Sequence, residues 1–117
     1  MLGPIDDNQP LNSLIGTALS GVVFTRHYIQ LAFDGPLLNM DARPTIQAGK
    51  LNLSSGESGF RDALCERIGV LVAAADVQEG IALSLTFADG SVLTLPLTHE
   101  DKPYAAEFRS GLDLWEW

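Results

Sequence analysis

Hydrophobic and polar residues alternate along much of this chain, and short turn sequences interrupt the alternation. A period of two predicts β-strands, because successive side chains of a strand point to opposite faces of a sheet. The Asp-Gly pairs at 34–35 and 89–90 each stand between two such runs, which is a strong signal for a hairpin turn. The predicted strands cover residues 19–25, 28–33, 37–40, 70–77, 81–87 and 92–97, with an edge extension of the third as far as Ile46 left open.

Two short helices are predicted where apolar residues recur at spacings of three and four. Pro10 suits the first position of the earlier helix, and Gly16 ends it. Ser58 is expected to cap the later helix, and Gly69 to end it. The apolar stripe of the later helix consists of Phe60, Ala63, Leu64 and Ile68.

The order of one helix and three strands occurs twice. The Ile-Gly pair at 15–16 recurs at 68–69, and the Leu-x-Phe triplet at 31–33 recurs at 85–87. These recurrences predict an internal duplication of helix-βββ units. The two copies span residues 10–46 and 58–97.

The chain of 117 residues therefore predicts a single domain of the α+β class over residues 1–117. Neither copy could bury its apolar face alone, so we expect a six-stranded, mainly antiparallel, barrel-like sheet or sandwich with two short helices. The linker at 47–58 is rich in glycine and serine and is expected to be flexible. The C-terminal tail, residues 98–117, has no counterpart in the first copy, and a short helix is expected at 104–109.

Charge limits the classes of partner. Acidic residues outnumber basic ones by 15 to 7, and the net charge of −8 disfavours nucleic acid and anionic membranes. No apolar stretch is long enough to span a bilayer, and residues 1–7 lack the basic and apolar regions of a signal peptide. The single cysteine, Cys65, cannot form an internal disulfide. Together these features predict a cytoplasmic protein that binds no nucleic acid and no membrane.

Only 19% of the residues are charged, and 46% are apolar, so a partner is expected to cover some apolar surface. The acids concentrate in residues 59–117, which hold ten acids and four bases. That half could attract a basic partner, although an acidic surface is also ordinary for a soluble protein.

Candidate catalytic and metal-binding residues have simpler interpretations. His27 suits a hairpin turn, and Cys65 is expected to pack in the core as a small apolar residue. Residues 99–101, His-Glu-Asp, offer ligand atoms, but a solvated loop is favoured over a metal site. Residues 56–59 miss the spacing of a nucleophile elbow and fit a helix cap better than a phosphate site. No catalytic residue, metal ligand or cofactor is therefore assigned.

Two tryptophans, Trp115 and Trp117, are the candidate partner-binding residues. Large aromatic side chains are enriched in binding anchors, and these two alternate on one face of an extended segment. The alternative, which the sequence favours, is that both fold back as a lid on the mouth of the barrel.

Several motifs resemble those of short bacterial proteins that carry a domain of unknown function. The motifs are the segment 28–36 (Tyr-Ile-Gln-Leu-Ala-Phe-Asp-Gly-Pro), the helix segment 60–65 with the Ile-Gly pair at 68–69, and the turn region 85–90. The resemblance covers roughly residues 15–97. It implies a bacterial cytoplasmic protein and carries over no catalytic residues.

The sequence favours a noncatalytic protein-interaction module with a protein partner or a homodimer, for instance a regulatory or immunity-type protein. The alternative is a small-ligand-binding protein or enzyme that uses a pocket in or at the mouth of the barrel. A pocket with a polar group inside, lined by Phe24, Tyr28, Phe33 or Phe87, would support this alternative.

Overall fold

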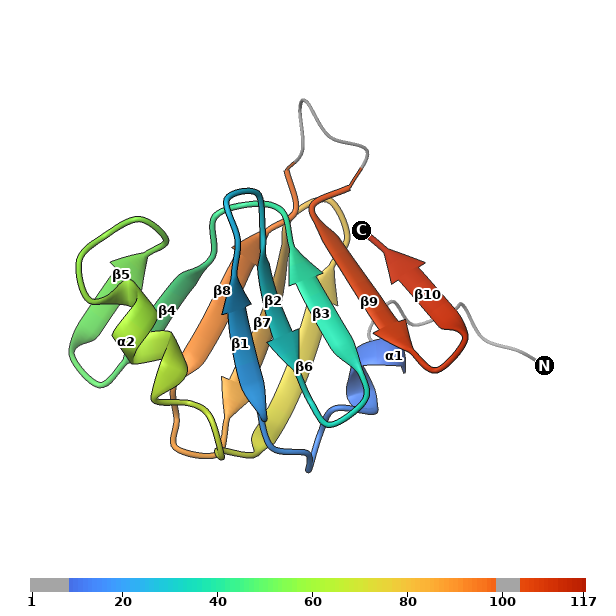
Figure 1. Cartoon of the computed structure of the whole chain (residues 1–117), viewed down its shortest axis with the longest axis horizontal. Helices are drawn as coiled ribbons and strands as arrows, with labels where there is room; N and C mark the ends of the chain where they lie inside the picture. Colours follow the sequence, from blue (N-terminus) through green and yellow to red (C-terminus); the bar gives the residue numbers. More distant parts are fainter. Residues whose placement is uncertain (1–8, 99–103) are drawn as a thin grey trace.

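A computed structural model describes residues 9–98 and 104–117 of the chain. Antiparallel strands make up most of it, and two short helices complete it (Figure 1). The described elements are α1 (Gln9–Asn12), β1 (Gly21–Phe24), β2 (Ile29–Ala32), β3 (Leu37–Met40), β4 (Thr45–Ala48), β5 (Leu51–Ser54), α2 (Phe60–Cys65), β6 (Val72–Gln78), β7 (Ala82–Phe87), β8 (Val92–Pro96), β9 (Ala106–Ser110) and β10 (Asp113–Glu116).

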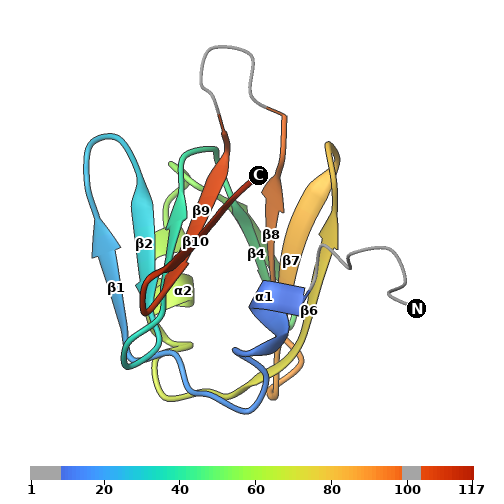
Figure 2. The same cartoon turned by 90° about the vertical axis from the view of Figure 1, so that its right-hand side faces the viewer.

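The strands form two five-stranded sheets that face each other (Figure 2). Sheet 1 has the order β1-β2-β3-β9-β10, and sheet 2 has the order β5-β4-β8-β7-β6. Each sheet is a three-stranded meander extended by a hairpin from the other half of the chain. The α+β class is therefore confirmed. The prediction of six strands in a barrel-like sheet or sandwich is corrected to two facing sheets of five strands each, which do not close into a barrel.

Both predicted Asp-Gly turns are present. The turn at 34–35 joins β2 to β3, and Asp34 adopts a φ of 55° there, which aspartate tolerates better than most residues. The turn at 89–90 joins β7 to β8, in which the strand pairs run from Ala82↔Pro96 to Thr86↔Val92. The inward residues of both hairpins are buried, as their alternation predicts.

The linker expected to be flexible is instead a strand hairpin. β4 and β5 pair from Thr45↔Ser54 to Ala48↔Leu51, and Gly49 at φ 61° makes the two-residue turn between them. Glycine accepts this left-handed conformation without steric cost. Ile46 lies in β4 of sheet 2, so it does not extend the third strand of sheet 1.

The tail is also a strand hairpin, and the helix expected at 104–109 is wrong. β9 and β10 pair from Glu107↔Glu116 to Ser110↔Asp113, with Gly111 at φ 61° in the turn. β9 also pairs with β3, so the tail completes sheet 1.

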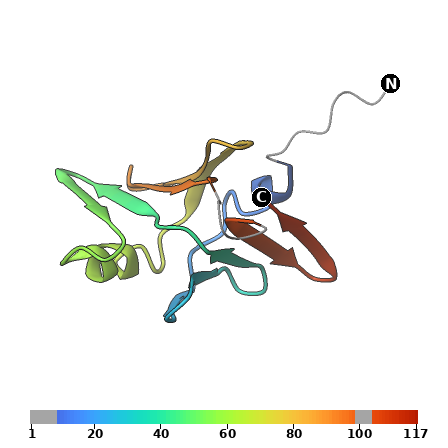
Figure 3. The same cartoon turned by 90° about the horizontal axis from the view of Figure 1, so that it is seen from above.

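The core lies between the two sheets and is built from their inward side chains. Leu38 of sheet 1 and Leu85 of sheet 2 are fully buried examples. The helices lie at opposite ends of the space between the sheets: α1 contacts β6, while α2 contacts β4 and β1 (Figures 1 and 3). Within α2, Phe60, Ala63 and Leu64 are buried as predicted. Ile68 lies beyond the helix and is exposed.

Main-chain hydrogen bonds join the segments that lead into the two meanders. The Gly16 N–H donates to the Val72 carbonyl at 2.8 Å, and the Gly69 N–H donates to the Leu19 carbonyl at 2.7 Å. The Val72 N–H in turn donates to the Thr17 carbonyl at 2.8 Å. The two halves of the chain are thus tied together at the base of both sheets.

A buried arginine ties the segment after α2 to the turn between β7 and β8. Arg67 Nη1 lies 3.3 Å from Asp89 Oδ2, and Asp89 Oδ1 accepts hydrogen bonds from the Ser91 N–H and hydroxyl. Partial burial raises the pKa of the Asp89 carboxyl, but the Ser91 hydrogen bonds and the Arg67 charge outweigh that effect. The net result is a pKa below its ordinary value of 3.8.

Candidate functional site

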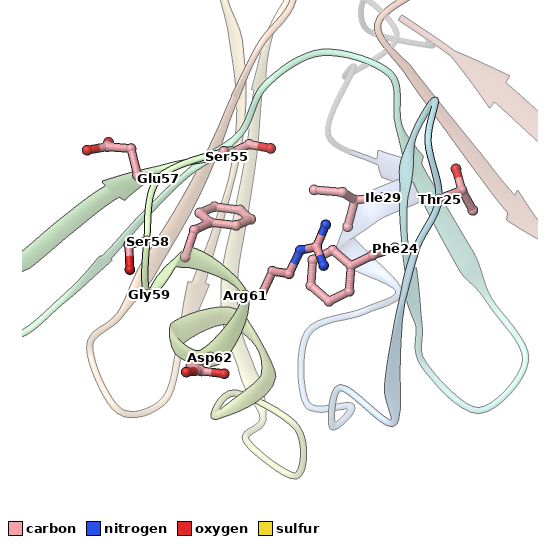
Figure 4. A pocket seen from close by; sticks show the side chains of 11 residues that line it. Phe24, Thr25, Ile29, Ser55, Glu57, Ser58, Gly59, Arg61 and Asp62 are labelled. Atoms are coloured by element: carbon pink, nitrogen blue, oxygen red, sulfur yellow. The ribbon is translucent and has the colours of Figure 1, made fainter.

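A cleft of about 470 Å³ lies between the β1–β2 hairpin and the start of α2 (Figure 4). It occupies the end of the molecule where α2 stands between the edge strands of the two sheets. Its lining residues are Phe24, Thr25, Ile29, Ser55, Gly56, Glu57, Ser58, Gly59, Phe60, Arg61 and Asp62.

Apolar side chains form the base of the cleft. Phe24 and Ile29 are directly paired across the β1–β2 hairpin, and both belong to the inward face of sheet 1. Phe60 is buried at the start of α2 and contributes from the opposite wall. The base is therefore continuous with the hydrophobic core and is held by it.

The N-terminus of α2 is capped differently from the prediction. Gly59 is the N-cap residue at φ 90°, and no side chain caps the helix, so the predicted capping role of Ser58 is wrong. Glu57 Oε1 instead accepts a hydrogen bond from the Ser54 N–H at 2.7 Å, which fixes the loop to the end of β5. A left-handed glycine at this position turns the chain so that Arg61 follows on the cleft side of the helix.

Arg61 spans the cleft. Its guanidinium lies over the Phe24 ring, 5.2 Å from the ring centroid, in a cation–π contact. Figure 4 shows the Arg61 side chain extending from α2 toward Phe24, whereas Glu57 and Asp62 point away from it. The stacked face of the guanidinium is occupied, but its N–H edge is available to a ligand.

A second hollow of about 330 Å³ continues the cleft along the hairpin. The two hollows share Thr25, Ile29, Ser55 and Gly56. The residues that only the second hollow has are Arg26, His27, Tyr28, Met40, Asp41, Ala42 and Arg43. Together the hollows make one elongated cleft with cations at both ends.

The hairpin turn that carries Arg26 and His27 is fixed by a neighbouring hydroxyl. Thr25 Oγ1 accepts hydrogen bonds from the N–H groups of His27 at 3.2 Å and Tyr28 at 3.0 Å, and it donates to the Tyr28 carbonyl. The Thr25 N–H also donates to that carbonyl at 2.9 Å. These bonds hold the turn in one conformation, which reduces the entropy lost when a ligand binds.

The arginines of the chain divide into two groups. Arg67 and Arg109 form ion pairs, with Asp89 and Glu66 in the first case and Glu107 in the second. Arg26, Arg43 and Arg61 form no ion pair with any residue that the structure describes. All three of these line the cleft.

This convergence cannot be predicted from the sequence, because the three arginines stand far apart in the chain. They come from the β1–β2 turn, the segment before β4 and the start of α2. Two of the four aromatic residues that the sequence predicts for a pocket, Phe24 and Tyr28, do line the cleft. Phe33 and Phe87 are buried in the core instead.

The two candidate tryptophans lie at the other end of the molecule. The Trp115 ring stacks on Phe108, with the ring centroids 5.7 Å apart, and Trp117 also packs against the core. The Trp117 N–H donates to the Ala106 carbonyl at 2.9 Å. Both side chains are thus partly buried against the core, and their role in partner binding stays a prediction.

Other residues considered for chemistry are not brought together. His27 lies in the hairpin turn, as predicted. Cys65 is exposed, so its predicted place in the core is wrong; it is the last residue of α2 and lies off the stripe formed by Phe60 and Leu64. Among the described residues no group of three metal-ligating side chains forms, and residues 99–101 lie outside that part of the chain.

No family model, curated protein or solved structure matches this chain. The resemblance to short bacterial proteins with a domain of unknown function therefore stays a prediction. Within residues 9–98 and 104–117, no helix is long and apolar enough to cross a membrane.

Proposed function

We propose that this protein is a noncatalytic protein-interaction module whose cleft receives a segment of a partner protein. The observation that carries the proposal is the convergence, on an elongated cleft with an apolar base, of three arginines that form no ion pair within residues 9–98 and 104–117. Apolar surface and cationic groups are the components of a recognition site: the first supplies affinity and the second supplies orientation.

The shape of the cleft favours a partner segment over a small molecule. Pockets for small molecules usually enclose about 70–90% of the surface of their ligand. Here the two hollows run along the β1–β2 hairpin and share four lining residues, so a ligand that filled both would be elongated. A regulatory or immunity-type protein is one concrete form of the proposal.

The second candidate is a small-ligand-binding protein or enzyme. It is supported by Phe24 and Tyr28, which line the cleft beside a polar group, Arg61. Phe33 and Phe87 do not contribute to it, since both are buried between the sheets. For that reason we rank it second.

We also infer that the chain is an internal duplication with exchanged hairpins. The hydrogen bonds between Gly16 and Val72 and between Gly69 and Leu19 support this, because each relates the same two positions of the proposed copies in opposite directions. Each meander is also extended by the hairpin that follows the other meander. Two such halves resemble a dimer joined into one chain.

Site-specific photo-crosslinking tests the proposed function. A photoreactive residue in place of Ser58, in the cleft, should capture a discrete partner in a lysate of the source organism. The same residue in place of Leu112, fully exposed at the tip of the β9–β10 hairpin, is the matched control. Capture at Leu112 and none at Ser58 would move the partner to the tail, and the proposal would then be abandoned.

A further inference from the structure

We propose that the cleft recognises an acidic segment of a partner protein in an extended conformation, with an apolar side chain between two carboxylates. The proposal rests on the proposed function, because it specifies the chemistry of the segment that the cleft receives. The net charge of −8 by itself would suggest a basic partner, whereas the residues of the cleft favour an acidic one.

The cations of the cleft are available to an incoming carboxylate. The acidic residues in the lining are Asp41, Glu57 and Asp62. Asp41 has an interaction of its own, and Glu57 Oε1 accepts from the Ser54 N–H. Asp62 and Glu57 point away from Arg61 (Figure 4).

Arg61 is oriented for a carboxylate. Because the Phe24 ring covers one face of the guanidinium, the side chain loses less rotational freedom when its N–H edge binds an anion. The fork of N–H donors on that edge matches the two oxygens of a carboxylate. This end of the cleft therefore fits one acidic side chain.

The other end of the cleft fits a second acidic side chain. Arg26 and Arg43 both line the second hollow, and they come from different segments, the β1–β2 turn and the segment before β4. The Thr25 hydroxyl fixes the backbone of the turn that carries Arg26, so the base of this side chain is held beside the cleft before a ligand arrives.

An apolar residue fits between the two acids. Ile29 belongs to both hollows, and it is flanked by Phe24 on the side of Arg61 and by Met40 on the side of Arg43. As a whole residue Ile29 is 8% exposed, so it forms a rigid floor with a small accessible surface, and the half-buried Phe24 beside it adds apolar contact area. In an extended segment, side chains two positions apart project from the same side. Acids two residues before and two residues after the apolar residue would therefore face the cleft with it and lie toward its two ends.

The negative charge of the rest of the molecule would add selectivity. With acids outnumbering bases by 15 to 7, most of the surface repels an acidic segment. Binding in the cleft would place carboxylates next to the three arginines that pair with no acid among the described residues. A segment whose acidic side chains lie outside the cleft would obtain no electrostatic contribution to its affinity.

The test uses the purified 117-residue protein and the eight-residue peptide Asp-Ser-Leu-Ser-Asp-Ser-Leu-Ser, titrated by calorimetry. The serine spacers place the aspartate and leucine side chains on the same side of an extended peptide. The same peptide with asparagine in place of aspartate is the matched ligand control. We expect the acidic peptide to bind at least roughly tenfold more tightly, given the strength of charge-assisted hydrogen bonds. Arg61→Ala should weaken its binding by a similar factor, and Arg61→Lys by less.

Lys50→Ala is the matched control variant, because Lys50 is an exposed cation in the β4–β5 turn outside the cleft. It should leave peptide binding unchanged. Unchanged circular dichroism and melting temperature of the Arg61 variants would confirm that they fold. A loss with Lys50→Ala as large as that with Arg61→Ala would overturn the proposal, since attraction would then be nonspecific.

Two further results would overturn it. Equal affinity for the acidic and the neutral peptide would remove the role of the arginines, and equally tight binding of a free six-carbon dicarboxylic acid would replace the peptide by a small ligand. Capture of a partner at Ser58 without binding of the acidic peptide would overturn this inference and leave the proposed function standing. Loss of both would overturn both.

Discussion

Two hairpins extend the sheets, β4–β5 and β9–β10. They share a backbone geometry but differ in the size of their inward side chains. Each has a two-residue turn that begins with a glycine at φ 61°, Gly49 in the first and Gly111 in the second. Each joins a meander from the other half of the chain, and they lie at opposite ends of the molecule (Figure 3). The backbone plan is therefore shared.

The side chains at matching register positions differ. In β9–β10 the inward pair is Phe108 and Trp115, whose stacked rings close their end of the core. In β4–β5 the inward pair is Ile46 and Leu53, which are smaller. The cleft opens at this second end, over Phe60. The volume of one inward pair thus distinguishes a closed end from an open one.

The largest expected effect comes from removing the Trp115 ring, which tests whether that side chain closes its end of the core. Trp115→Ala should lower the free energy of unfolding by about 2–3 kcal/mol, because it removes a partly buried aromatic ring and its stacking on Phe108. Leu53→Ala, the matched change in the other hairpin, should cost about 1 kcal/mol since its side chain is smaller and half-buried. Urea denaturation measures both.

Equal losses of unfolding free energy in Trp115→Ala and Leu53→Ala would show that the tryptophan does not stabilise its end of the core more than the leucine does. An unchanged free energy of unfolding in Trp115→Ala, combined with loss of partner capture, would instead favour the anchor role predicted for Trp115 and Trp117. Trp115→Phe keeps an aromatic ring that can stack on Phe108 but reduces its size. It should therefore retain most of the unfolding free energy that Trp115→Ala loses.

The two turn glycines sharpen the comparison. Gly49→Ala and Gly111→Ala should each cost about 1 kcal/mol, because an L side chain is strained in the left-handed region. No atom lies within 4 Å of a Cβ built at either position, so the backbone conformation alone should set the cost. Thermal denaturation should give equal shifts, and clearly unequal shifts would contradict a shared turn geometry.

The smallest expected effect concerns the Arg67–Asp89 contact, which belongs to the second meander. Since the pKa of Asp89 is lowered on folding, the contact should stabilise the protein above the ordinary pKa of 3.8 and be lost as pH falls through the lower folded-state value. The Asp89 side chain is 37% exposed, so solvent screening limits the contribution to about 0.5 kcal/mol.

Asp89→Asn should therefore cost stability at pH 7 and much less at pH 3, as measured by urea denaturation at both values. Asp34→Asn, in the corresponding turn of the first meander, is the control. A cost of Asp89→Asn that is the same at both pH values would show that the charge of Asp89 is not the stabilising feature.

Local patterns were enough to predict the two meanders. Alternation marks β7 and β8, and the Asp-Gly pair at 89–90 specifies the turn between them. The other two hairpins escaped prediction because their turns are Gly-Lys and Gly-Leu, whose fit to a two-residue turn depends only on the glycine conformation. The glycine and serine content near 54–59 then suggested flexibility, although Leu51 and Leu53 belong to a strand.

The candidate site could be predicted only in part. Phe24 was recognisable, since an aromatic residue at the end of a hairpin strand lies near a sheet end. The arginines were not, because Arg26, Arg43 and Arg61 meet only when sheet 1 and α2 have been placed against each other. The exposure of Cys65 depends in the same way on where α2 ends.

The exchange of hairpins between the sheets affects how the chain can fold during synthesis. Sheet 1 pairs Leu38 of β3 with Phe108 of β9, so its third strand emerges from the ribosome long before its partner does. Until then β3 is an unpaired edge, and unpaired edges promote aggregation. Sheet 2, by contrast, has all its strands once β8 has been made. We therefore expect sheet 2 to form first on the ribosome and to hold the nascent chain until the last hairpin arrives.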